Sequence, residues 1–133
     1  MITLSDFKDW LKKKLRMRYV NWFTGGLRDS REKAIVIYNG NAFINPMAIG
    51  GLKNSSYRGK GIRVLVHWNK NAKDSELRAQ KVYKAIHGLT NEIIANKRVV
   101  QFNMRDPEPI FLGVDESGIY EYVIDLEMII ERW

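Results

Sequence analysis

The sequence contains no cysteine, only three prolines, and no long apolar run in its 133 residues. The absence of cysteine excludes a disulfide framework, a thiolate zinc site and a cysteine nucleophile. A membrane-spanning helix needs about 18 consecutive apolar residues, so no membrane partner is expected. The first residues also lack the basic-then-apolar layout of a secretory signal peptide. We therefore expect a protein that folds in a reducing cytosol.

The length and composition favour one globular domain spanning residues 1–133. Compact domains usually run to about 100–200 residues, and this chain has no internal repeat or low-complexity tract. Apolar residues make up 45% of the chain and charged residues 28%, which is close to the average for globular proteins. A chain of this length can bury a core without disulfides or metals.

The charge is positive overall but unevenly distributed. The formal net charge is +7, yet residues 1–89 carry a balance of +12 and residues 90–133 a balance of −5. This asymmetry leaves three interpretations open. In the first, the basic part binds phosphates. In the second, the basic and acidic parts meet across copies of the chain, and in the third, each charge lies on a solvated face.

Apolar periodicity predicts two helices and several strands. Spacings of three and four residues indicate helices over residues 4 to about 18 and about 75–88. β-branched and aromatic runs indicate strands over 33–38, 62–68, 98–104 and 110–114. Residues 42–49 form a further extended candidate, with Pro46 favouring an edge position.

The last segment, residues 119–131, alternates with a period of two and predicts a long strand with one buried face. Acidic residues fill most of its predicted outward face. The order of the elements predicts an α+β fold, in which one mostly antiparallel β-sheet packs against two α-helices.

Residues 50–61 form the clearest predicted loop, with four glycines, two serines and three cations. We expect this loop to be mobile until a partner orders it. Gly59-Lys60-Gly61 departs from the phosphate-binding pattern, which requires Ser or Thr after the lysine and a following helix. The cations near Tyr57 are nevertheless typical of a surface that stacks on and neutralises a nucleic acid. They are Lys53, Arg58, Lys60 and Arg63.

No catalytic or metal-binding pattern emerges. His67 and His87 lie in different predicted elements, without the spacing of a metal site. Asp106 and Glu108 flank prolines in a connector, which favours a solvated turn over acid–base catalysis. We predict a protein that is not an enzyme and takes no cofactor or metal, with a small enzyme of unrecognised motif as a lesser alternative.

The pattern from the second predicted helix onward carries a family resemblance. An amphipathic helix with a central aromatic, Tyr83, is followed after a strand by Pro109-Ile-Phe-Leu112-Gly113-Val-Asp115 and a tyrosine-rich closing strand. Over residues 62–133 the chain resembles the tail terminator, or tail-completion, family of long-tailed bacteriophages. Members of this family are often labelled minor capsid proteins.

The resemblance implies a small α/β virion protein that forms a hexameric ring. Such a ring caps the finished tail tube, stops its growth and joins it to the head connector. The implied partners are other copies of the chain, the tail tube protein and the head–tail connector protein. Genomic DNA passes through the lumen without being read by sequence. The implied location is the tail or neck of the virion, after assembly in the host cytoplasm.

A ring needs two different complementary surfaces on each copy. We predict that an acidic surface meets basic residues of a neighbour, and that the loop over 50–61 projects toward the tube, the connector or the lumen. The acidic candidates are Asp115, Glu116, Glu121, Asp125 and Glu127; those of the loop are Lys53, Tyr57, Arg58 and Lys60. Another head–tail joining or tail tube protein, and a small basic nucleic-acid-binding module, remain as alternatives.

Overall fold

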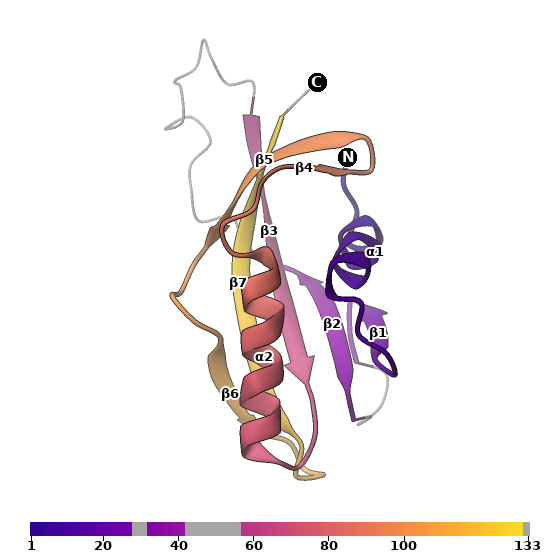
Figure 1. The fold of residues 1–133 in the computed structure, drawn as a ribbon, viewed down its shortest axis with the longest axis vertical. Coiled ribbons are helices and arrows are strands. Elements are labelled where there is room, and N and C mark those ends of the chain that lie inside the picture. Colours follow the sequence, from indigo (N-terminus) through magenta and orange to yellow (C-terminus); the bar gives the residue numbers. More distant parts are fainter. Residues whose placement is uncertain (28–31, 42–56, 132–133) are drawn as a thin grey trace.

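The computed structural model describes residues 1–27, 32–41 and 57–131. The chain forms two helices and seven strands in the part described (Figure 1). In order they are α1 (Leu4–Leu15), β1 (Asn21–Thr24), β2 (Ala34–Asn39), β3 (Tyr57–His67), α2 (Ala72–Ile86), β4 (Thr90–Ile94), β5 (Lys97–Met104), β6 (Ile110–Val114) and β7 (Tyr120–Glu131).

The strands form one curled sheet in the order β1-β2-β3-β7-β5-β4, with β6 also paired to β7. Only β1 and β2 run parallel to each other among the described pairs. β7 pairs with β3 along its whole length, whereas its other edge is shared by β5 near the C-terminal end and β6 near the start. This arrangement confirms the predicted α+β class with a mostly antiparallel sheet.

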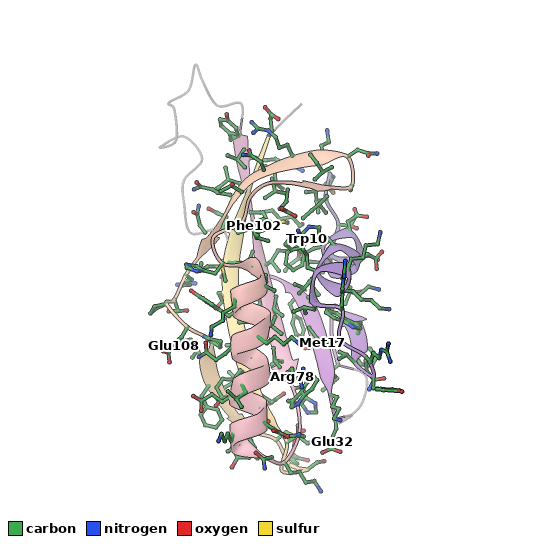
Figure 2. All side chains as sticks on the ribbon, in the orientation of Figure 1. Trp10, Met17, Glu32, Arg78, Phe102 and Glu108 are labelled. Atoms are coloured by element: carbon green, nitrogen blue, oxygen red, sulfur yellow. The ribbon has the colours of Figure 1, made fainter. Side chains whose placement is uncertain are left out.

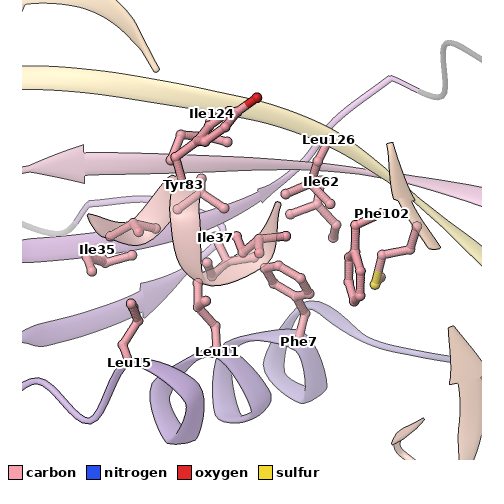
Figure 3. Packing of buried hydrophobic residues seen from close by; sticks show 14 of the residues in the cluster. Phe7, Leu11, Leu15, Ile35, Ile37, Ile62, Tyr83, Phe102, Ile124 and Leu126 are labelled. Carbon is pink, nitrogen blue, oxygen red and sulfur yellow. The ribbon is translucent and has the colours of Figure 1, made fainter. Parts of the chain in front are cut away.

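One hydrophobic cluster contains residues from both helices and from one face of the sheet (Figure 3). α1 contributes Phe7, Leu11 and Leu15, whose spacing of four residues places them along one buried side of the helix. The helix begins at a capping box, in which Thr3 and Asp6 exchange backbone-to-side-chain hydrogen bonds of 2.9 and 3.1 Å. The cap and the buried stripe together fix the position of α1 beside β2 and β1.

The helix boundaries differ slightly from the prediction. α1 ends at Leu15 because Arg16 takes a left-handed conformation with φ of 50°, which closes the helix. α2 begins at Ala72, three residues earlier than predicted. Its N-cap is Asn71, whose side chain accepts a hydrogen bond from the backbone N–H of Asp74. The short strands β1 and β4 were not predicted.

The prediction of a loop over 50–61 is wrong at its C-terminal end. β3 begins at Tyr57, so residues 57–61 belong to a strand that pairs with β7. The remainder of that predicted loop, including Lys53, lies outside the described residues. The extended segment predicted over 42–49 lies outside them as well.

The glycine at the centre of this strand explains the correction. Gly61 packs so closely against the turn after β2 that a Cβ atom would lie 2.6 Å from the carbonyl carbon of Asn41. The backbone N–H of Gly40 donates a 3.0 Å hydrogen bond to the carbonyl oxygen of Gly61. Glycine is therefore required here for a close backbone approach, and it does not mark a loop.

The prediction that β7 has a single buried face is also wrong. Val123, Glu127 and Ile129, all on the predicted outward face, are buried. β7 lies inside the sheet, with β3 along one edge and β5 and β6 along the other. Side chains of an interior strand have neighbours on both sides, and Leu65 of β3 is buried beside Val123 on this same face. The alternation in the sequence therefore does not mark a solvated acidic face.

Candidate functional site

The predicted interface residues fall in three regions: the turn after β6, the outward-predicted face of β7, and the start of β3. Within residues 1–27, 32–41 and 57–131, no group of three or more His, Asp or Glu side chains is arranged to hold a metal ion. No helix in the described part of the chain is long and apolar enough to cross a membrane.

Asp115 holds the turn between β6 and β7 together. Its Oδ1 accepts hydrogen bonds from the backbone N–H groups of Ser117 and Ile119, both at 2.9 Å. Its Oδ2 lies 2.7 Å from Nε2 of His67, a fully buried residue of β3. Glu116, by contrast, is exposed at the tip of the turn. Of the two predicted carboxylates, Glu116 is therefore the one that is exposed on the surface of the subunit.

Glu121 lies opposite His67 in the register of β7 and β3. Its Oε2 is 4.0 Å from Nε2 of His67. Burial raises the pKa of the Glu121 carboxyl above its ordinary value of 4.5, His67 lowers it and Asp115 raises it. His67, Asp115 and Glu121 thus form a partly buried cluster that attaches the turn to the sheet.

Replacing Glu121 with glutamine is expected to change how stability depends on pH. The folded protein holds this proton more tightly than the unfolded chain, so the free energy of unfolding falls as the pH rises from about 4.5 through the raised pKa. The Glu121→Gln variant lacks this loss, so its stability relative to the wild type should increase across that window and then level off. Urea unfolding at several pH values measures the difference, and Glu116→Gln controls for the loss of one carboxylate. A pH-independent difference would contradict the raised pKa.

The remaining acidic candidates on β7 interact within the subunit. Asp125 forms a two-pronged ion pair with Arg63 of β3, with distances of 2.7 and 3.0 Å. Glu127 is fully buried, and its carboxylate oxygen occupies the space 2.6 Å from where a Cβ of Gly59 would lie. Its predicted place on an outward face is therefore wrong. Arg63 belongs to the proposed nucleic-acid surface in the sequence, but it is paired in the structure.

The basic residues at the start of β3 do not gather around the tyrosine. Because side chains of a strand alternate, Tyr57 lies on the face of Glu131, whereas Arg58 and Lys60 lie on the opposite face. All three of these β3 residues are half-buried. The continuous basic surface predicted for a nucleic-acid-binding module is therefore not formed by the described residues.

Exposed positive charge is concentrated at the end of α1 and just after it. Lys14 forms a 2.8 Å ion pair with Glu92 of β4, which also accepts a 3.1 Å hydrogen bond from Trp10. The end of α1 lies on the side of the molecule opposite β6 (Figure 1), and the neighbouring cations are exposed. They are Lys12, Lys13, Arg16 and Arg18. This run of cations is visible in the sequence. Cations are favoured at the C-terminal end of any helix by the helix dipole, so the run by itself does not indicate a binding surface.

An exposed apolar strand is the feature that the sequence does not reveal. Four of the five residues of β6 are large, apolar and 43–56% exposed: Ile110, Phe111, Leu112 and Val114. Acidic side chains flank the strand. Exposed Glu108 precedes it (Figure 2), and exposed Glu116 follows it. A short apolar run usually indicates a buried strand, so only the sheet order shows that this one forms an edge.

These observations define a small α+β protein whose distinctive surfaces are an apolar edge strand and a basic helix end. Residues 15–132 match the family model described as bacteriophage tail terminator protein, and the chain belongs to this family. The match confirms the resemblance seen in the sequence and extends it through most of the N-terminal half. The family is one of structural phage proteins, which makes the chain a virion component. No curated protein matches the chain.

Proposed function

We propose that this protein is the subunit of a ring that caps the finished phage tail tube, ends its elongation and joins it to the head connector. The family match over residues 15–132 is the observation that carries the proposal. The surface supports it, because a head-to-tail ring needs two unlike surfaces on each copy. The apolar strand β6 and the basic end of α1 lie on opposite sides of the subunit (Figure 1).

The proposed ring has six copies and occupies the neck of the virion, after assembly in the host cytoplasm. Its partners are the tail tube protein on one face and the head–tail connector protein on the other. Genomic DNA passes through the lumen, where contacts are electrostatic and independent of base sequence. The exposed cations at the end of α1 are suited to either a protein or a phosphate contact.

A tube-growth assay tests the capping step. Purified tail tube protein of the same phage is polymerised with and without this chain, and tube lengths are measured by electron microscopy. We expect shorter tubes that carry a ring at one end. An unrelated protein of similar size and positive charge is the control for nonspecific binding. Unchanged lengths and bare tube ends would contradict capping, and binding to the connector alone would favour another head–tail joining protein.

A further inference from the structure

β6 presents an open edge of the sheet to its surroundings. Among the described strands it pairs only with β7, so no described strand covers its outer edge. An edge strand presents backbone N–H and C=O groups that serve as a template for another strand. Soluble proteins usually protect such an edge with charged side chains or with a covering element. β6 instead exposes large apolar side chains along its edge, and exposed apolar surface of this kind indicates a docking site.

Apolar groups lie on both faces of the sheet at this edge. The ring of Phe111 packs against Tyr120 and Tyr122 of β7, with centroids 6.0 and 5.4 Å apart. On the other side, Leu112 lines a shallow surface pocket together with Leu65 and Val123. An added strand would therefore bury apolar surface on both of its faces while it forms backbone hydrogen bonds.

The opposite edge of the same sheet is β1. In the part of the sheet that contains β6, the strand order is β1-β2-β3-β7-β6. The two edge strands of this part, β1 and β6, lie on opposite sides of the molecule (Figure 1). The segment before β1 carries exposed Arg16 and Arg18 and also Tyr19, which is 88% exposed. The segments beside β6 carry exposed Glu108 and Glu116. The two edges are therefore complementary in charge.

The strand directions also fit a head-to-tail contact. β1 runs parallel to β2, and each step from β2 through β3 and β7 to β6 reverses direction. β1 and β6 consequently run in opposite directions. Copies related by rotation about an axis along the strands keep those directions. The β6 strand of one copy would then meet the β1 strand of the next in an antiparallel pair, the more stable arrangement.

We propose that β6 of one copy pairs with β1 of the next, so that the sheets continue around the ring. The occupant of the β6 edge is a second copy of this chain. In the antiparallel pair the segment before β1 meets the segment after β6, so Arg16 and Arg18 of that copy face Glu116. This pairing rests on the proposed function, because it specifies the contact between ring subunits. It also gives each subunit two different edges that pair with each other, as a closed head-to-tail ring requires.

A charged substitution in the edge tests the contact. Leu112→Lys places an ammonium group in the apolar contact and is expected to raise the concentration needed for assembly by about tenfold or more. Ile93→Lys is the matched control, because Ile93 is 61% exposed on the edge strand β4. Sedimentation velocity should show the control assembling as the wild type does. Equal assembly by both variants would overturn the pairing but leave the ring standing.

Cross-linking tests which edges meet. The chain has no cysteine, so single cysteines introduced by Leu112→Cys and Thr24→Cys react without background. A mixture of the two variants, treated with a short bismaleimide, is expected to give a dimer that links position 112 to position 24. The pair Leu112→Cys and Ile93→Cys is the control and should give none. Cross-linking only between two copies of position 112 would overturn the head-to-tail pairing in favour of a two-fold contact.

The wild-type chain separates the two proposals. If it forms rings that survive Leu112→Lys and give no cross-link between positions 112 and 24, the pairing of β6 with β1 is wrong while the ring stands. If the wild type stays monomeric at every concentration and does not cap tubes, the proposed function fails and this contact fails with it.

Discussion

Replacing Phe7 with alanine is expected to lower the free energy of unfolding by about 3–5 kcal/mol. Phe7 is fully buried in the cluster shared by both helices and the sheet (Figure 3). The centroid of its ring lies 5.5 Å from that of Trp10. Removal of the ring loses apolar burial and leaves a cavity that neighbouring elements cannot fill. Urea denaturation followed by tryptophan fluorescence measures the change.

Tyr19→Ala is the control for this prediction. Tyr19 lies just beyond α1 and is 88% exposed, so its removal should change stability by no more than about 0.5 kcal/mol. A loss below about 1 kcal/mol for Phe7→Ala would show that α1 is not packed on the sheet as described. The basic end of α1 would then lack the fixed position that the proposed contact with β6 needs.

Replacing Gly61 with alanine is expected to destabilise the protein by about 3 kcal/mol, near the upper end of ordinary overpacking effects. The added Cβ would meet backbone on one side, 2.6 Å from the carbonyl carbon of Asn41 and 2.7 Å from the carbonyl carbon and oxygen of Gly40. Backbone atoms of a turn that is hydrogen-bonded to β3 cannot move as a flexible side chain can. Thermal and urea unfolding of the purified variant measure the loss.

Gly26→Ala is the matched control for this substitution. A Cβ at Gly26 has no atom within 4 Å, and the residue does not need the left-handed backbone that glycine favours. We expect stability within about 0.5 kcal/mol of the wild type. If Gly61→Ala were equally neutral, the close approach of β3 to the turn after β2 would be wrong, and residues 57–61 would be a loop after all.

Periodicity predicts the helices and most strands because the buried apolar residues of each element recur at the regular spacing of a helix or a strand. It fails at residues 57–61 because glycines at 59 and 61 are typical of a loop, whereas here they leave room for the Glu127 carboxylate and for backbone. It also fails for β1 and β4. These strands are short, and pairing with β2 and β5 rather than their own pattern holds them in place.

The candidate site is harder to predict because its acidic residues find partners far away in the chain. Arg63 pairs with Asp125, and His67 with Asp115, across strands that only the fold brings together. Lys14 likewise pairs with Glu92. Part of the contrast between the basic first part of the chain and the acidic last part is therefore neutralised inside the subunit.

The charge that remains exposed is arranged differently from the prediction. Sequence reasoning assigns the interface to the acidic residues of the last strand, of which Glu127 is buried and Asp125 is ion-paired. Glu116 keeps its predicted exposure and borders the apolar strand β6. The sequence does not predict that β6 is an exposed edge, because residues 110–114 would also suit a strand in the centre of a sheet.

Negative-stain electron microscopy of the purified chain at physiological salt is the decisive test of the proposed ring. Mass photometry of the same sample gives the number of 15.5 kDa subunits in each particle. We expect closed rings with six-fold symmetry and a single assembled mass. A chain that remains monomeric across the concentration range, and that shifts only on addition of DNA at low salt, would contradict the ring and favour a nucleic-acid-binding module.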